Sequence, residues 1–210
     1  MESTAPASTS EAQPREQRIL AKRPLLYRLA ASLTGAEGLD PPADKVLALV
    51  SRTIGPGRVR DALSGSFLGH PLHPLLTDVP IGAWTSALIL DLSGGPGARP
   101  AARRLIGAGV LAALPTATTG WVEWSDSAGT NPGTRRVGIV HAAANITALS
   151  LYGASYVARR RGRGGRGLAL AGAGALAVGG HLGGHLSYVH GEGVAGVDSE
   201  RAGQPATAAA

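Results

Sequence analysis

The sequence predicts an all-α integral membrane protein, an up-down-up-down four-helix bundle preceded by an amphipathic N-terminal helical arm. First, four apolar segments follow one another between Leu75 and Tyr188, separated by short polar connections. The shortest holds about 18 residues, which as a helix spans ~27 Å and so approaches the thickness of a bilayer's hydrocarbon layer. Second, no charged residue occurs between Leu105 and Val122 or between Gly167 and Gly180, whereas a helix of a soluble bundle would carry a polar stripe. Third, the chain has 31 glycines and only 4% aromatic residues, as suits close-packed membrane helices.

The first third of the chain is expected to form the arm. Residues 1–15 are small, polar and proline-containing, which predicts disorder, and no signal peptide is recognisable in them. The arm covers residues 16–66, with an amphipathic stretch over 17–33 that Pro24 interrupts and short helices over 44–54 and 58–63. Basic amphipathic helices of this kind lie in the headgroup layer or pack on their own domain, and both alternatives stay open.

A transmembrane domain over residues 67–192 follows, with spans at about 75–92, 105–122, 137–157 and 167–188 and a disordered tail over 193–210. The first and third connections carry eight arginines and no acid, whereas the opposite face mixes both signs of charge. Positive charge next to a span favours the cytoplasm. We therefore expect a multi-pass protein of the bacterial cytoplasmic membrane whose opposite face is extracytoplasmic.

Composition excludes several classes of function. The chain has no cysteine, so disulfides, thiolate metal sites, an iron–sulfur cluster and covalently attached haem are ruled out within it. The net charge of +6 comes largely from runs of arginine between apolar segments, which indicates membrane topology and no nucleic-acid partner. No serine stands in a nucleophile-elbow context and no nucleotide-binding loop is present, so the chain shows no catalytic motif.

The six histidines are expected on one side of the membrane. His70 and His73 alternate with Pro71 and Pro74 just before the first span, and the prolines should prevent a regular helix there. Ionisable groups inside a bilayer are costly and usually mark a functional site. Asp78, one turn into the first span, should therefore need a partner, such as an arginine of the same face or a protonated histidine.

The ends of the other three spans supply the remaining candidates. Thr119 and Glu123 close the second span, and His141 and Asn145 open the third, each pair four residues apart. His181, His185 and Tyr188 share one face at the end of the fourth span. By helical rise, His141, His181 and His185 reach overlapping depths, which is the geometry of a bis-imidazole haem or another metal site within a bundle.

Four motifs in order make the chain resemble the bacterial membrane family called domain of unknown function 2231. They are Gly69–Trp84, Gly120–Asp126, the pair His141 and Asn145, and Gly180–Tyr188, and the likeness covers about residues 60–195. The resemblance implies a four-helix membrane protein with no assigned reaction. Some relatives carry a Rieske iron–sulfur or cytochrome domain on the same chain, which implies electron transfer. This chain has no such domain, so its redox partner would be a separate protein.

The function expected is that of a haem-binding or electron-transfer subunit in the lipid bilayer. Haem b is the candidate cofactor, with His141 paired with His181 or His185 as axial ligands and His73 as a further candidate. Thr119, Glu123, Asn145 and Tyr188 would bind the cofactor's polar groups or move protons. The alternatives are a non-haem metal-binding or transport protein and a non-catalytic membrane anchor or assembly factor. A homo-oligomer is compatible with each of them.

Overall fold

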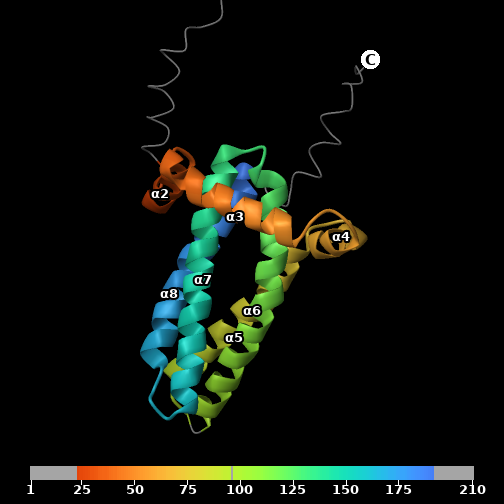
Figure 1. Ribbon diagram of the computed structural model, residues 1–210. Coiled ribbons are helices and arrows are strands. Elements are labelled where there is room, and N and C mark those ends of the chain that lie inside the picture. The colour runs from red at the N-terminus through yellow and green to blue at the C-terminus, as the bar shows by residue number, and fades with distance from the viewer. Residues whose placement is uncertain (1–22, 96, 192–210) are drawn as a thin grey trace, which may run out of the picture.

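The computed structural model describes residues 23–95 and 97–191, and this part of the chain is helical throughout, without strands (Figure 1). Four long helices form an antiparallel bundle, and five short elements lie across one end of it. The short elements are α2 (Leu25–Thr34), η1 (Glu37–Leu39), α3 (Asp40–Thr53), α4 (Arg58–Ser64) and η2 (Ser66–Leu68). The long helices are α5 (Leu72–Ser93), α6 (Ala98–Ala128), α7 (Pro132–Arg160) and α8 (Arg166–His190).

All four long helices are long and apolar enough to cross a membrane. Each extends beyond its expected span, most of all α6, which begins at Ala98 and takes three arginines into its first two turns. The predicted segments of the arm are present from Leu25 onward, although α3 begins at Asp40 because Pro41 and Pro42 fit the first turn of a helix. The segments expected to be disordered, 1–15 and 193–210, lie outside the described residues.

The two ends of the bundle differ in how they are packed. At one end, which we call the arginine end, lie the connections between α5 and α6 and between α7 and α8. The core there is built on Trp84, whose indole stacks on Tyr152 with ring centroids 4.2 Å apart and donates from Nε1 to the Ile106 carbonyl oxygen at 3.3 Å. A Cβ at residue 109 would lie 2.4 Å from Trp84 Nε1, so only glycine fits beneath the indole.

The opposite end, which we call the arm end, is closed by α2 and α3. Ala30 of α2 is buried with Val137 of α7 and Leu182 of α8. Ala43 of α3 is buried with Trp124 and Ala128 of α6. The arm therefore packs on the bundle through its buried face, while Leu25, Leu26 and Leu29 remain exposed on α2.

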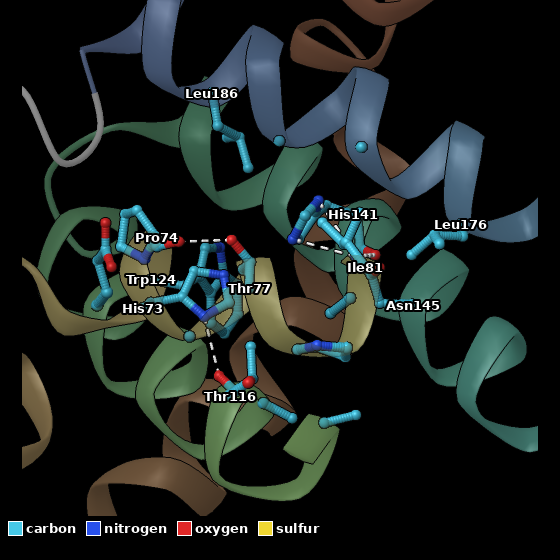
Figure 2. Close-up of a pocket in the computed structure, with 18 of the residues that line it drawn as sticks. His73, Pro74, Thr77, Ile81, Thr116, Trp124, His141, Asn145, Leu176 and Leu186 are labelled. Carbon is cyan, nitrogen blue, oxygen red and sulfur yellow. Dashed lines mark hydrogen bonds between the residues drawn. The ribbon is translucent and has the colours of Figure 1, made fainter. Parts of the chain in front are cut away.

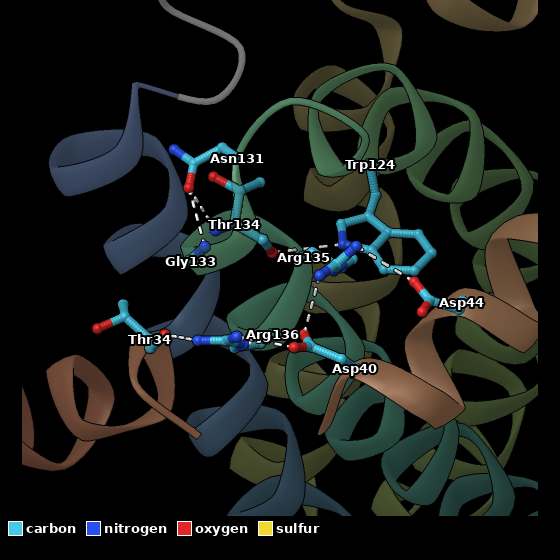
Figure 3. Close-up of polar contacts among 9 residues, drawn as sticks. All are labelled: Thr34, Asp40, Asp44, Trp124, Asn131, Gly133, Thr134, Arg135 and Arg136. Carbon is cyan, nitrogen blue, oxygen red and sulfur yellow. Dashed lines mark hydrogen bonds and ion pairs between the residues drawn. The ribbon is translucent and has the colours of Figure 1, made fainter. Parts of the chain in front are cut away.

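Ion pairs fix the arm to the start of α7 (Figure 3). Arg136 donates to both carboxylate oxygens of Asp40, at 2.9 and 2.7 Å, and to the Thr34 carbonyl oxygen at 2.7 Å. Arg135 bridges Asp40 and Asp44 at 3.1 and 3.2 Å. The bonds from Arg136 hold the pKa of Asp40 below its usual value. Asn131 caps α7 by accepting from the backbone N–H groups of Gly133 and Thr134.

The long helices are not packed evenly around the bundle. α5 packs mainly on α6 and α7 mainly on α8, so the domain consists of two helical hairpins. The hairpins meet mostly through α6 and α7, and α5 and α8 make few contacts with each other. This arrangement leaves a space between the hairpins that all four helices line.

Candidate functional site

A cavity of about 330 Å³ lies between the four long helices (Figure 2), and Trp84 and Leu149 are among its lining residues. Its walls are mostly apolar, and its polar groups come mainly from α5, α6 and α7, with Ser187 from α8. They include His73, Thr116, Glu123, His141 and Asn145. Pro74, Ile81, Ile146 and Gly180 also line the cavity and are exposed, so it opens to the outside of the bundle along the spans. A mostly apolar cavity with a few convergent polar groups is the usual form of a small-molecule site.

His73 contributes one imidazole from the first turn of α5. Pro71 precedes the helix and Pro74 lies within its first turn, where a missing N–H costs no intrahelical bond. The prolines therefore start the helix at Leu72, contrary to the expectation that they would exclude one here. Nδ1 of His73 donates to the Thr116 carbonyl oxygen at 2.9 Å, so in the neutral ring Nε2 carries the lone pair.

Thr116 and Gly120 of α6 position this ring. The Thr116 carbonyl oxygen also accepts from Thr119 Oγ1 at 2.8 Å, and Thr119 itself is buried behind it. A Cβ at residue 120 would lie 2.7 Å from His73 Cε1, so glycine makes room for the imidazole. Thr119 therefore supports the anchor of His73 and is not part of the cavity lining.

His141 contributes the second imidazole, from α7. Its Nδ1 donates to the Gly179 carbonyl oxygen of α8 at 2.9 Å, which again places the lone pair on Nε2. A Cβ at residue 183 would lie 3.0 Å from His141 Cε1. Asn145 Nδ2 donates to the His141 carbonyl oxygen at 2.9 Å and lies 3.2 Å from His141 Nε2. Both histidines thus use Nδ1 to bind a backbone carbonyl of the next helix in the chain.

Glu123 joins this cavity to a second one at the arm end. The second cavity, of about 450 Å³, is lined by Glu123 together with Asp126, Asn131, Thr134 and His190, among others. Glu123 belongs to both linings and lies one helical turn beyond Gly120 on α6. Glu123 therefore lies where the two cavities adjoin.

His181 and His185 do not share this cavity, which corrects the expected pairing of His141 with either of them. Gly179 and Gly183 face α7, and each histidine follows one of these glycines by two residues, which turns it by about 200° around α8. Nε2 of His181 donates to the Leu26 carbonyl oxygen of α2 at 3.1 Å. His141 contacts Gly179 and Gly183 of α8, whereas the side chain of His181 contacts α2.

His185 belongs to a separate group of rings under the arm. It is buried, with its centroid 5.4 Å from that of Tyr27 and 5.3 Å from that of His190. Nε2 of His185 and Nε2 of His190 are buried without a hydrogen-bond partner among the described residues. Tyr188 is 90% exposed and lies away from both cavities. The fourth span therefore supplies glycines, not histidines, to the main cavity.

Asp78 also differs from expectation. It is exposed on the outer side of α5, and no hydrogen bond or ion pair to it occurs among the described residues. The arginines expected to pair with it, Arg135 and Arg136, bind Asp40 and Asp44 of the arm. The carboxylates that neutralise the start of α7 thus come from more than 90 residues earlier in the chain.

The fold and cavity define a polytopic membrane protein with two anchored imidazoles between its spans. Residues 69–196 match the family described as "Predicted membrane protein (DUF2231)", and the chain belongs to this family. The matched region takes in α5 to α8 and thus every residue of the main cavity. No curated protein and no solved structure matches the chain.

Proposed function

We propose that this protein is a redox subunit of the bacterial plasma membrane that holds haem b between His73 and His141. The observation that carries the proposal is the shared geometry of the two imidazoles. Histidines that ligate a metal commonly donate their other N–H to a carbonyl or carboxylate, which fixes the ring and its tautomer. His73 and His141 both do so and come from different helices, as bis-histidine ligation in a bundle requires.

The number of donors favours haem over a bare metal ion. Among residues 23–95 and 97–191, no group of three or more His, Cys, Asp or Glu side chains is placed to hold a metal. A structural or catalytic zinc site needs three or four protein ligands. A porphyrin brings four nitrogens of its own, so two imidazoles complete its coordination. Between Leu176 and Leu186, the α8 wall of the cavity is formed by Gly180, Gly183 and Gly184, and a wall of glycines suits a flat ligand.

The protein groups around the cavity have distinct roles in this proposal. Bound haem would supply a one-electron couple within the membrane. The carbonyls of Thr116 and Gly179 hold the two rings in the tautomer whose Nε2 is free to bind. Asn145 would have to give up its contact with Nε2 of His141 and could keep its bond to the His141 carbonyl oxygen. Glu123 takes up or releases the proton that accompanies a change of charge in the apolar cavity.

Orientation and partners extend the same proposal. The arm end, with the histidines, faces the extracytoplasmic side because the arginine end carries the excess of positive charge next to the spans. Electrons then pass to or from a separate protein with an iron–sulfur or cytochrome domain at the arm end. A homo-oligomer would leave this arrangement unchanged.

A difference spectrum tests the proposal. The full chain is expressed with ample haem, purified in detergent, and measured as dithionite-reduced minus oxidised. We expect a b-type band that His73→Gly and His141→Gly each abolish and that His181→Ala and His185→Ala leave in place. Added imidazole should restore the band in the glycine variants, which separates loss of a ligand from loss of the fold. A wild-type protein without the band contradicts the proposal.

The same samples distinguish the alternatives. Elemental analysis that finds a stoichiometric metal without a porphyrin spectrum would support a non-haem metal or transport protein. Neither signal, in a protein that stays folded, would leave a membrane anchor or assembly factor. Where the band is present, Glu123→Gln should weaken the pH dependence of the midpoint potential, because an uncharged amide cannot take up the compensating proton. An unchanged pH dependence would exclude Glu123 from that role.

A further inference from the structure

The arginine end carries far more positive charge than its acidic residues can pair with. Eight arginines lie in or beside the two connections there, and Asp91 is the single acidic residue among the described residues of this end. Arg159 binds both oxygens of Asp91, and Arg166 Nε lies 3.6 Å from Oδ1 of the same carboxylate. Six arginines remain, and we call them the free arginines: Arg99, Arg103, Arg104, Arg160, Arg161 and Arg163.

The free arginines have no carboxylate partner in the part of the chain that the structure describes, and all but Arg103 are exposed. The arm end provides the contrast. There Arg60 pairs with Asp126, and Arg135 and Arg136 pair with Asp40 and Asp44. The arm end therefore carries acidic residues that pair with three of its arginines, although Arg28, Lys45, Arg52 and Arg58 form no ion pair with the described residues. The arginine end has a single described acid for eight arginines.

The position of the free arginines suits contact with a phospholipid headgroup. Arg160 is the last residue of α7, while Arg99 lies in the first turn of α6, so the guanidinium groups stand where the spans leave the hydrocarbon layer. Exposed apolar side chains occur at the same end of the bundle: Leu92 on α5, Val157 on α7 and Leu170 on α8. A ligand bound here would contact guanidinium groups with its polar headgroup and apolar side chains with its hydrocarbon part.

The helix ends add to the positive potential. α6 and α8 both begin at this end, after Gly97 and Gly165, and neither has a side-chain cap. The N-terminus of a helix carries a partial positive charge and unsatisfied N–H groups. An acidic side chain at the cap would have offset this charge, and glycine does not.

We propose that the arginine end binds anionic phospholipids, with the phosphodiester of the headgroup on the free arginines and an acyl chain along Val157 or Leu170. Guanidinium groups bind phosphate oxygens in a bidentate manner, and each basic residue near a membrane surface adds to the attraction for anionic lipid. The exposed apolar side chains favour a lipid over an acidic soluble protein, which would leave them uncovered. The inference does not depend on the cofactor of the main cavity.

Lipid binding to the purified full chain tests the inference. Native mass spectrometry from a neutral detergent counts bound phosphatidylglycerol and phosphatidylcholine across a titration. The variant R160Q/R161Q/R163Q removes three charges from the arginine end. The matched control, K45Q/R52Q/R58Q, removes three charges from exposed residues of α3 and α4 at the arm end.

We expect wild type to prefer phosphatidylglycerol and the first variant to lose that preference. Each arginine near the surface is worth a factor of about 5 at low salt, so three of them should weaken phosphatidylglycerol binding by tenfold or more. Phosphatidylcholine binding and the control variant should be unchanged. Salt at about 1 M, where the Debye length falls to about 3 Å, should remove most of the preference.

Several results would overturn the inference. Equal loss in the control would mean attraction by net charge and no site. Equal binding of the two lipids by wild type would point to a partner other than lipid. Full competition by inorganic phosphate at equal concentration would point to a free-anion site without an acyl-chain contact. A second variant, R99Q/R103Q/R104Q, should behave as the first does, so misfolding of one variant does not decide the outcome.

Discussion

Replacing Asp91 by asparagine tests how the arginine end is held together. The Asp91 side chain is 6% exposed and that of Arg159 7% exposed, and the guanidinium meets both carboxylate oxygens, one of them at 2.9 Å. Arg159 Nε also donates to Ser155 Oγ at 3.1 Å, so this arginine is fixed by two helices. Asparagine keeps the shape of aspartate but removes its charge and turns an amide N–H toward the guanidinium.

The expected cost follows from burial. Removing one partner of a buried ion pair leaves an uncompensated charge and costs about 3–5 kcal/mol. For a domain of this size, 1 kcal/mol lowers the unfolding temperature by about 2–4 °C, so Asp91→Asn should lower it by about 6–20 °C. Asp44 provides the matched control because its side chain is 59% exposed and lies 3.2 Å from Arg135. An exposed pair is worth about 0–1 kcal/mol, which corresponds to at most about 4 °C.

Thermal unfolding followed by tryptophan fluorescence measures both variants in one detergent and at one scan rate, since unfolding of a membrane protein is often irreversible. A double variant, D91L/R159M, should recover much of the loss, because apolar replacement of a buried pair is often neutral. Equal shifts for Asp91→Asn and Asp44→Asn would refute the reasoning. They would mean that water and headgroups solvate Arg159 as fully as they do Arg135.

Three further predictions concern packing, pH and topology. Gly138→Ala should destabilise by about 1–3 kcal/mol in denaturant or heat, since its Cβ would lie 2.1 Å from Trp124 Nε1. On the same helix, Gly153→Ala meets nothing within 4 Å and should be neutral or stabilising. Because Arg136 holds the pKa of Asp40 below 3.8, stability from this contact is present above that pH and lost as pH falls through the folded value. Asp40→Asn should therefore unfold earlier than wild type at neutral pH and converge with it in acid, and a constant gap would contradict this. The chain has no cysteine, so an impermeant maleimide in intact cells should label Thr130→Cys and spare Ser93→Cys, and the reverse pattern would invert the topology.

The four spans were predictable because an apolar run of bilayer length has few alternatives in a chain of this composition. The ends of the four helices were less predictable. The first turns of α6 are rich in arginine, and hydropathy places the boundary after Arg104, whereas the backbone stays helical from Ala98. Side chains of arginine at a membrane surface extend into the headgroups, so charge there does not end a helix.

The site was predictable in part. His141 and Asn145, expected on one helix face, and Glu123, expected at the end of the second span, all line the main cavity. His73 was named as a further candidate, but His181 and His185 were preferred as partners of His141, because sequence does not give the rotation of α8 about its axis. That rotation is set by the glycines at 179 and 183, which let α7 approach closely. The bond of His73 to Thr116 joins residues 43 positions apart and has no local signature.

The division into two hairpins, with little contact between α5 and α8, determines how a ligand would reach the two imidazoles. The Trp84–Tyr152 stack joins α5 to α7 across the two hairpins, so a small rotation of one hairpin against the other that pivots at this stack would widen the gap between α5 and α8 at the arm end. A molecule dissolved among the acyl chains would then enter the main cavity from the bilayer, between α5 and α8, without passing through water. Occupancy of the main cavity would then depend on the concentration of a compound in the lipid, and not on its concentration in the aqueous compartments on either side.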